Sequence, residues 1–224
     1  MMDWTDRHCR AFHRVLSRHA LLYTEMAVDK ALIHGDPERI IGFDPIEQPV
    51  ALQLGGSVPE DLAAAARIGA GFGYAEINLN IGCPSDRVQS GRFGACLMQE
   101  PELVADCVRA MQDAVDVPVT VKMRRGLDDT EQAEADFYAI LDGAYALGVS
   151  AITVHGRTVR QRYDGPSRWA FVAAVKQHVG ERVLLGSGDL FSPFAVRDML
   201  TQTGVDGVTI ARGCIGNPFI FDQT

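Results

Sequence analysis

Short apolar runs alternate with amphipathic stretches along the whole chain, and this alternation predicts the fold. The apolar runs occupy residues 21–24, 49–54, 75–79, 118–122, 151–154, 183–185 and 207–210. They are apolar almost throughout rather than at every second position, which is typical of parallel strands covered on both faces. We therefore expect seven buried strands in a parallel sheet.

The stretches between these runs have helical periodicity. They lie at residues 62–68, 101–115, 131–147, 169–178 and 195–200. In the second of them, Leu103, Val104, Cys107, Val108 and Met111 recur at helical spacing after a proline near the start. Each strand is thus followed by a helix or a loop, as in repeated strand–helix units.

Seven such units without a linker or an internal repeat favour a (β/α)8 barrel, which has eight strands. The missing strand should be the first, because the chain opens directly into a helix over residues 6–19. An open, doubly wound sheet is the alternative. It is disfavoured because no GxGxxG motif follows the first apolar run.

The N-terminal helix has two different sides. Cys9, Phe12 and Leu16 form an apolar side that we expect to be buried. The opposite side carries Arg7, Arg10, Arg14 and Arg18. We interpret this basic stripe as a solvated helix face rather than a contact with RNA.

Composition limits the function classes. The length of 224 residues and a 47% hydrophobic content suit one domain with a substantial core. No apolar run approaches the roughly 18–20 residues that span a bilayer, and the N-terminus shows no signal peptide. Cys9, Cys83, Cys96, Cys107 and Cys214 form no CxxC pair, so we expect no metal site and a reducing, cytoplasmic location.

The charge balance weakens, without excluding, an interaction with nucleic acid. The net charge of −8 is the opposite of a basic footprint. Of the 21 basic residues, however, only Lys30, Lys122 and Lys176 are lysines. Arginine is the better side chain for bidentate contact with phosphate.

Cys83 follows an apolar run and stands between Gly82 and Pro84, on an expected tight turn at a strand exit. In a barrel, that position belongs to the catalytic rim. Thiols are mostly protonated at neutral pH, so Cys83 could serve as a general acid. A buried structural cysteine is the alternative, and the position alone favours neither.

Polar or reactive groups follow all seven expected strands. They are Glu25, Gln53, Asn78 with Asn80 and Cys83, Lys122 with Arg124, His155 with Arg157, Ser187 to Asp189, and Arg212 with Gly213. Barrel enzymes gather their working groups at the carboxyl ends of strands, so we expect these side chains to share one rim.

The last two strands are followed by small-residue turns. Ser187, Gly188 and Asp189 form one turn, and Ala211 and Arg212 belong to the other. Exposed backbone N–H groups and a guanidinium suit a phosphate group, and barrels often bind phosphate after their seventh and eighth strands. We expect a phosphate site here.

These segments resemble the tRNA-dihydrouridine synthases, with the N-terminal half closest to the A-type branch. The similar segments are residues 3–10, 22–26, 51–56, 78–89, 121–124, 154–158 and 210–213. The Asn-Leu-Asn-Ile-Gly-Cys-Pro motif at 78–84 is the most specific of them. The resemblance covers essentially the whole chain.

The resemblance implies a flavin mononucleotide (FMN) in the barrel. Met1 and Met2 would lie beside the flavin, Gln53 at its pyrimidine edge, Lys122 near N1 and O2, and His155 against the ring. A cation near N1 stabilises the anionic reduced flavin. Ser187, Gly188, Asp189, Ala211 and Arg212 would hold the phosphate.

The implied reaction is reduction of uridine to 5,6-dihydrouridine in the D-loop of tRNA, with NADPH or NADH as reductant. Hydride from reduced FMN would reach uracil C6 while Cys83 protonates C5, with Asn80 beside the uracil. The base must leave its stack to be reached. Candidates for holding the RNA backbone are Arg87, Arg92, Arg124, Arg157, Arg160, Arg162 and Arg168.

The chain departs from the family in places. The first strand and the family's C-terminal helical tRNA-binding domain are missing, so we expect residues 1–224 to be one FMN-binding catalytic barrel truncated at both ends. Residues 155–158 and 163–166 look more like other bacterial branches, and Ser187 stands where the family often has asparagine. The modified position stays open, and we expect a monomer.

Two other functions are alternatives to uridine reduction. Lys122, near Arg124 and Arg125, could form a Schiff base in an aldolase-type barrel. A non-catalytic tRNA-binding remnant is the second alternative, suggested by the missing termini.

Overall fold

A single parallel sheet forms the centre of the protein. The computed structural model describes residues 1–85 and 93–224. Its strands are β1 (Leu22–Tyr23), β2 (Ala27–Val28), β3 (Val50–Gly55), β4 (Glu76–Asn80), β5 (Val119–Arg124), β6 (Ile152–His155), β7 (Leu184–Ser187) and β8 (Gly207–Thr209). Pairing runs β1-β3-β4-β5-β6-β7-β8, β2 also pairs with β3, and all strand pairs among the described residues are parallel.

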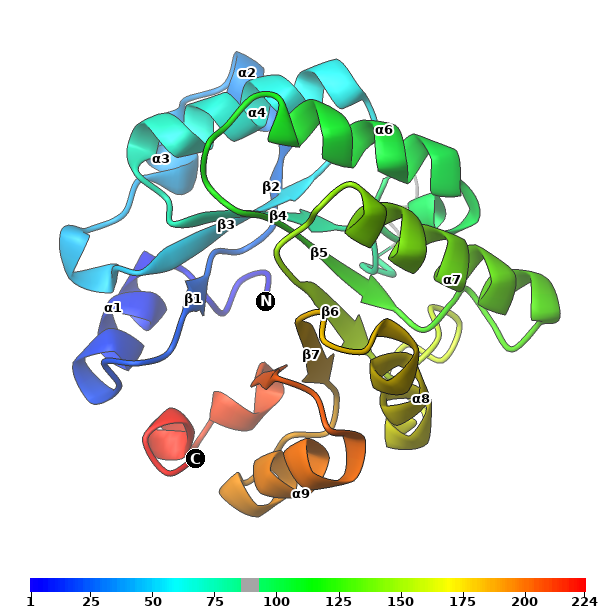
Figure 1. Ribbon diagram of the computed structural model, residues 1–224. Helices are drawn as coiled ribbons and strands as arrows, with labels where there is room; N and C mark the ends of the chain where they lie inside the picture. Colours follow the sequence, from blue (N-terminus) through cyan, green and yellow to red (C-terminus); the bar gives the residue numbers. More distant parts are fainter. Residues whose placement is uncertain (86–92) are drawn as a thin grey trace.

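Helices surround the outer face of this curled sheet (Figure 1). The main ones are α4 (Pro59–Phe72), α6 (Pro101–Gln112), α7 (Glu131–Ala146), α8 (Trp169–Val179) and α9 (Pro193–Thr203). Near the N-terminus lie α1 (Arg7–Leu16), α2 (Asp29–His34) and α3 (Pro37–Ile41). The short 3-10 turns are η1 (Pro45–Glu47), η2 (Gly94–Gln99), η3 (Arg212–Cys214) and η4 (Pro218–Phe221).

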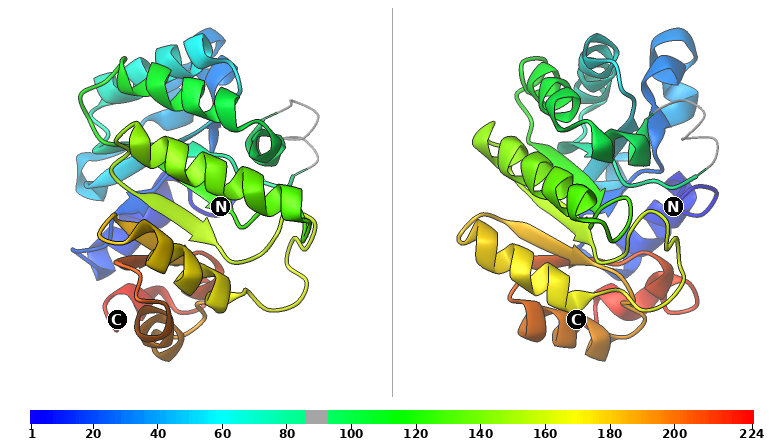
Figure 2. Two further views of the ribbon diagram at one scale, coloured as in Figure 1. Left: turned by 45° about the vertical axis from the view of Figure 1, so that its right-hand side comes forward. Right: turned by 90° about the vertical axis from the view of Figure 1, so that its right-hand side faces the viewer.

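The expected fold class is confirmed: consecutive parallel strands alternate with helices and curl as in a TIM barrel. The turned views in Figure 2 show α4, α6, α7 and α8 on the same side of the sheet. All seven predicted strands are present, with ends displaced by up to two residues. Within the described ranges, no helix is long and apolar enough to cross a membrane.

The edge strand is interrupted, and the sequence did not predict the interruption. β1 pairs with the start of β3 and β2 with its end, so the two short strands share one position in the sheet. Between them, the Thr24 hydroxyl accepts the Gln53 backbone N–H at 3.0 Å. A run of two residues such as β2 is too short to be recognised by periodicity.

The expectation of uniformly apolar strands is wrong for β4 and β5. Ile77 and Leu79 are fully buried in the apolar core, while Glu76, Asn78 and Asn80 occupy the alternate positions. Successive strand side chains point to opposite faces, so β4 has one apolar and one polar face. Both faces are buried because the polar side chains hydrogen-bond to one another across strands.

The predicted orientation of α1 is also wrong. Its buried residues are Arg10, His13 and Arg14, whereas Phe12 is 54% exposed. Arg10 forms an ion pair of 2.7 Å with the buried Glu47, and Arg14 donates to the carbonyl of Glu47 at 3.2 Å. Two of the four arginines of the basic stripe, Arg10 and Arg14, are therefore buried, and buried acceptors satisfy their guanidinium groups.

Candidate active site at the carboxyl ends of the strands

The sheet register brings the predicted residues into one rim. Gln53 is the register partner of Asn78, and Asn80 that of Lys122. His155 pairs with Arg124 on one side and with Ser187 on the other. Residues 25 to 42 positions apart in the sequence thus lie side by side on neighbouring strands, as the sequence predicts.

Cys83 lies on a turn that β5 holds in place. The Arg124 Nε–H donates to the Gly82 carbonyl at 3.0 Å, and the Cys83 carbonyl accepts from the Ala95 N–H at 3.1 Å. A Cβ on Gly82 would lie 3.0 Å from the Arg124 backbone nitrogen, so the close approach needs glycine. The Cys83 thiol is partly exposed, unlike the fully buried Cys107, and this agrees with the rim interpretation better than with a structural cysteine.

Arg124 is a buried clamp rather than an RNA contact. Only 5% of it is exposed. Besides Gly82, its guanidinium reaches the carbonyls of Thr158 and Arg162, each at 2.9 Å. It therefore ties the Cys83 turn to the loop after β6, and the expected role in holding the RNA backbone does not fit this burial.

Lys122 has no hydrogen-bond or ion-pair partner among the residues that the structure describes. Burial lowers the pKa of its ammonium from 10.5 to about 8, and the nearby Arg124 adds to this while Cys83 opposes it. A cation without a counter-ion is costly in a protein interior. Lys122 is thus a group with unused capacity to bind an anion or a carbonyl oxygen.

His155 has an unused nitrogen as well. Its Nδ1 lies 3.4 Å from the Ser187 hydroxyl, while its buried Nε2 has no partner among the described residues. Burial, followed by the charges of Lys122 and three arginines, lowers the pKa of His155 to about 2. The imidazole is therefore neutral at physiological pH and presents one unsatisfied polar atom.

Gln53 and Asn80 are linked to each other through their amides. The Asn80 Nδ2 group donates to Gln53 Oε1 at 2.7 Å, and Gln53 Nε2 donates to Asn78 at 2.8 Å. Asn80 also accepts the Gly82 N–H at 3.0 Å. The two residues predicted to contact flavin and uracil thus belong to one hydrogen-bonded group beside the Cys83 turn.

The two expected phosphate turns do meet, but Asp189 is occupied. Its carboxylate pairs with Arg157 at 2.8 Å and Arg212 at 3.5 Å, and it accepts the Ser167 N–H at 2.7 Å. A carboxylate repels phosphate, so the expected direct contact of Asp189 with a phosphate does not fit. Asp189 instead orients its two arginines.

The other members of these turns lie close by. The Arg212 guanidinium lies between the rings of Tyr163 and Phe191, at 4.5 and 5.0 Å. Gly188 has φ of 123°, and a Cβ there would meet Ser167. Ser187 is buried beside His155, and Ala211 is exposed. Arg212, Gly188 and Ala211 keep the capacity to meet an anion.

Met1 and Met2 lie on a turn held by a strand-end residue. The Glu25 carboxylate accepts the N–H groups of Trp4 and Thr5, at 3.0 and 3.3 Å. The Met1 amino group donates to the Thr5 hydroxyl at 2.6 Å, and burial lowers its pKa, with Lys122 contributing. Figure 1 shows this terminus inside the curl of the sheet. Met2 is about half exposed.

The expected RNA contacts divide into two kinds. Arg157 is only 4% exposed and donates twice to the Gly165 carbonyl, at 2.9 and 2.6 Å, besides its pair with Asp189. A contact with an RNA backbone does not fit that burial. Arg160 is 71% exposed and pairs with Asp128 at 2.9 Å, so it is accessible. Arg87 and Arg92 lie outside the described residues.

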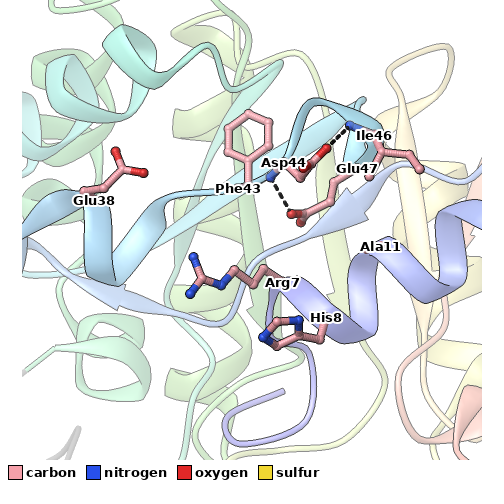
Figure 3. Close-up of a pocket in the computed structure, with 8 residues that line it drawn as sticks. All are labelled: Arg7, His8, Ala11, Glu38, Phe43, Asp44, Ile46 and Glu47. Carbon is pink, nitrogen blue, oxygen red and sulfur yellow. Dashed lines mark hydrogen bonds between the residues drawn. The ribbon is translucent and has the colours of Figure 1, made fainter.

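One surface pocket lies away from this rim, between α1 and residues 38–47 (Figure 3). It is lined by Arg7, His8, Ala11, Glu38, Phe43, Asp44, Ile46 and Glu47. None of these lining residues is a predicted site residue. The two hydrogen bonds drawn dashed in Figure 3, between Asp44 and Ile46 and between Glu47 and Asp44, cap the turn η1. In the described part of the chain, no group of three His, Cys, Asp or Glu residues is arranged to hold a metal.

Sequence reasoning missed several residues of the site. Thr120 and Glu76 continue the hydrogen-bonded group of Gln53, Asn78 and Asn80 below the rim. Ser167 packs against Gly188 at the other end of the rim. Thr120 and Glu76 interrupt apolar runs with single polar residues, and that interruption was the available signal. Ser167 offers no comparable signal.

Comparisons with known proteins agree with the resemblance. The family model described as Dihydrouridine synthase (Dus) matches residues 1–224. A tRNA-dihydrouridine(20/20a) synthase of Xanthomonas campestris is 48% identical, over 100% of this chain and 68% of its own length. The proteins of the same name from Synechocystis and Pseudomonas aeruginosa are each 46% identical, covering 99% and 98% of this chain and 68% of their own lengths.

A solved structure shares the fold. Histamine dehydrogenase from Rhizobium sp. 4-9 superposes with a TM-score of 0.73 at 13% identity. The match covers 97% of this chain and 42% of that one. At this identity the likeness concerns the fold alone, and it supports the barrel class.

Proposed function

The chain belongs to the dihydrouridine synthase family, and from this premise we propose that it reduces uridine to 5,6-dihydrouridine in tRNA. Because its relatives are tRNA-dihydrouridine(20/20a) synthases, we propose positions 20 and 20a of the D-loop as the modified ones. We further propose a monomeric, single-domain catalytic barrel that acts in the cytoplasm, where tRNA is found.

The rim fits an FMN cofactor. Among the described residues Lys122 has no counter-ion and the buried Nε2 of His155 has no partner, so a bound ring with carbonyl oxygens and ring nitrogens could satisfy both. Gln53 retains a free amide N–H, and Arg212 with Gly188 and Ala211 suits the phosphate. When bound and reduced by NADPH or NADH, FMN supplies the hydride that uracil C6 receives.

Cys83 supplies the proton in this proposal. Addition across the C5–C6 double bond needs one hydride and one proton, and the Cys83 S–H gives its proton to C5. Arg124 and Ala95 hold the backbone of the turn, so the thiol is positioned before the substrate arrives. The resulting thiolate lies near Lys122, whose positive charge stabilises it.

The tRNA would approach the rim from the side of the strand ends. Arg160 is the accessible cation that we assign to its backbone, and Asn80 to the uracil. Arg87 keeps its sequence-based assignment, and Arg157 becomes a residue that positions Asp189.

One observation carries the proposal. A partly exposed cysteine on a clamped turn shares one rim with a lysine and an imidazole nitrogen that have no partner among the described residues. Reduction of a planar base by a hydride donor and an acid needs this combination, and an ordinary buried core does not.

The test uses the purified protein with and without added FMN. We expect a yellow protein with flavin absorbance that forms dihydrouridine in a tRNA transcript with NADPH, as measured by mass spectrometry of nucleosides. Cys83→Ala should keep FMN and lose at least about a hundredfold in turnover. Cys9→Ala, a thiol outside the rim, serves as the matched control.

Two outcomes would contradict the proposal. A wild-type protein that is colourless and indifferent to FMN removes the active-enzyme function and leaves the tRNA-binding alternative, which salt-dependent tRNA binding without reductase activity would support. Full turnover in Cys83→Ala removes the assigned acid.

A second candidate function rests on the lowered pKa of Lys122, which favours a neutral amine able to form a Schiff base. Borohydride trapping of a carbonyl substrate on Lys122, lost in Lys122→Arg, would establish it. It leaves the Cys83 turn and the phosphate turns without a role, so we rank it second.

A further inference from the structure

A chain of side-chain hydrogen bonds crosses the inner face of the sheet below the rim, and we call it the amide ladder. From the rim inward it consists of Gly82, Asn80, Gln53, Asn78, Thr120 and Glu76. The side chains of Asn80, Asn78, Thr120 and Glu76 are buried. Every link is a side-chain amide, a hydroxyl or a carboxylate, except the backbone N–H of Gly82.

The upper end of the ladder has a fixed direction. The Gly82 backbone N–H can only donate, and it lies 3.0 Å from an amide atom of Asn80. That atom must therefore be Oδ1. The Nδ2 of Asn80 then faces Gln53 at 2.7 Å, so the Gln53 atom on that side must be its oxygen.

The lower end has a fixed direction too. The Glu76 carboxylate accepts from the Thr120 hydroxyl, and it also accepts from the Tyr23 hydroxyl at 2.7 Å. Burial, then the charge of Glu76, raises the pKa of Tyr23 far above its ordinary value, so that hydroxyl keeps its proton. With its single proton used, Thr120 must accept from Asn78 Nδ2, at 2.8 Å.

The two directions meet at Gln53 and agree. The upper end requires the Gln53 oxygen to face Asn80, and the lower end requires its nitrogen to face the Asn78 oxygen, at 2.8 Å. If the Gln53 amide were reversed, its nitrogen would face the Asn80 nitrogen and its oxygen would face the Asn78 oxygen. Neither pair could then form a hydrogen bond. In a buried site each unsatisfied group costs about 1–3 kcal/mol, so one orientation dominates.

We propose that Thr120, Asn78 and Glu76 are positioning residues that hold the Gln53 amide from below and so reinforce the orientation that Gly82 gives to Asn80. The lock leaves one free N–H on each of these two amides, because each amide nitrogen has two protons and the ladder uses one. An N–H donor held in one orientation can hydrogen-bond to a ring carbonyl oxygen, but it cannot hydrogen-bond to the N–H groups of a ring amino group.

The consequence for the substrate rests on the proposed function. Uracil has a carbonyl at C4, and cytosine has an amino donor there. A locked Asn80 can donate to the uracil carbonyl, whereas it meets a second donor in cytosine. An unlocked Asn80 could rotate its amide and accept either base. The ladder therefore adds discrimination between uridine and cytidine at the site.

The first test needs no cofactor. Side-chain amide hydrogen exchange of Gln53 and Asn80 is measured by NMR in the FMN-free protein. We expect Thr120→Val, which keeps the shape but removes the hydroxyl, to speed this exchange about tenfold, the loss of one buried hydrogen bond. Thr120→Ser keeps the hydroxyl and should match the wild type.

Matched controls separate the ladder from general packing. Tyr23→Phe removes another hydroxyl from the same Glu76 carboxylate but leaves every ladder bond in place. Glu76→Gln keeps an acceptor oxygen for Thr120. Both should retain wild-type exchange at Gln53 and Asn80. If Thr120→Val does not fold, Asn78→Ser opens the ladder at the next position and replaces it.

The second test measures discrimination. Binding of two tRNA transcripts, with uridine or with cytidine at positions 20 and 20a, is compared for each variant. We expect the wild type and Thr120→Ser to prefer uridine by about tenfold, and Thr120→Val to show a clearly smaller preference. The ratio is insensitive to a fraction of unfolded protein, so it reports positioning.

The outcomes are distinguishable. Equal exchange rates and equal binding ratios in Thr120→Val and Thr120→Ser would overturn the positioning role, even in an enzyme that reduces uridine normally. A wild-type protein without FMN or dihydrouridine formation contradicts the proposed function instead, and the exchange comparison still decides whether the ladder locks the two amides.

Discussion

Single residues at the rim hold charge and polarity that the fold itself does not satisfy. Lys122 is the strongest example, because burial lowers its pKa from 10.5 to about 8. Between those two pH values the unfolded chain binds the proton that the folded chain has released. Stability therefore rises with pH across that window, and below it the folded protein bears the cost of the buried charge.

Replacing Lys122 by methionine should stabilise the FMN-free protein. At pH 7 we expect the free energy of unfolding to rise by about 1–3 kcal/mol, because a buried unpaired charge is removed, with FMN affinity lost. The gain should shrink as the pH approaches 10. Urea unfolding at the two pH values measures it. Lys176→Met, which breaks the ion pair with Asp206, is the control and should show no gain.

The ring of His155 should stay neutral from pH 5 to 8. Burial, together with the charges around the ring, lowers its pKa to about 2, so the protonated form is excluded from the folded state. Below pH 6.5 the unfolded chain binds a proton that the folded chain rejects, and stability falls as the pH drops. NMR titration of the ring carbons checks this, and an inflection near pH 6.5 in the folded protein would show the inference to be wrong.

At the scale of elements, α1 is attached to the sheet by charge rather than by an apolar face. Arg10 pairs with Glu47 inside the protein, and Arg14 donates to the carbonyls of Glu47, Ser17, Ala20 and Pro49. Counting the bond from Arg10 to the Thr5 carbonyl, six hydrogen bonds from two arginines thus replace the usual hydrophobic contact of a helix. The exposed Phe12 on the same helix agrees with this.

Removing Arg10 should cost far more than removing its neighbour on the same helix. Arg10→Ala leaves Glu47 buried without its partner, and we expect a loss of about 3–5 kcal/mol in the free energy of unfolding. Arg7 is exposed, so Arg7→Ala should stay within about 0.5 kcal/mol of the wild type. Chemical denaturation compares the two, and similar losses would contradict an internal role for Arg10.

At the scale of the whole molecule, the sheet has a strong middle and short outer strands. β4 and β5 are paired on both sides along a fully buried face, whereas β1 and β2 have two residues each and β8 has three. The apolar core lies between the middle strands and the helices α4, α6 and α7. The Cys83 turn and Lys122 thus adjoin strands that are paired on both sides.

Native-state hydrogen exchange should follow this gradient. We expect the backbone amides of β4 and β5 to exchange slowest, at the rate of global unfolding, and those of β1, β2 and β8 to exchange at least about a hundredfold faster by local opening. Mass spectrometry of exchanged peptides measures it. Uniform protection across all strands would indicate that the sheet opens only as a unit.

The sequence by itself determined the order of seven strands and of the longer helices, the barrel class and the identity of the rim residues. These follow from local periodicity and from the rule that parallel strands end at one edge, which tie Cys83, Lys122 and His155 to the same place. Only the tertiary structure decided which polar residues are free to act. Arg157 and Asp189 are held by each other, and Arg10 is internal.

The physical reason is that a local pattern specifies which face of an element a residue occupies, not which partner it meets there. A buried arginine and a surface arginine have the same spacing along a helix, and only a distant carboxylate such as Glu47 separates them. The amide ladder is the same case, since its direction depends on Gly82 at one end and Glu76 at the other.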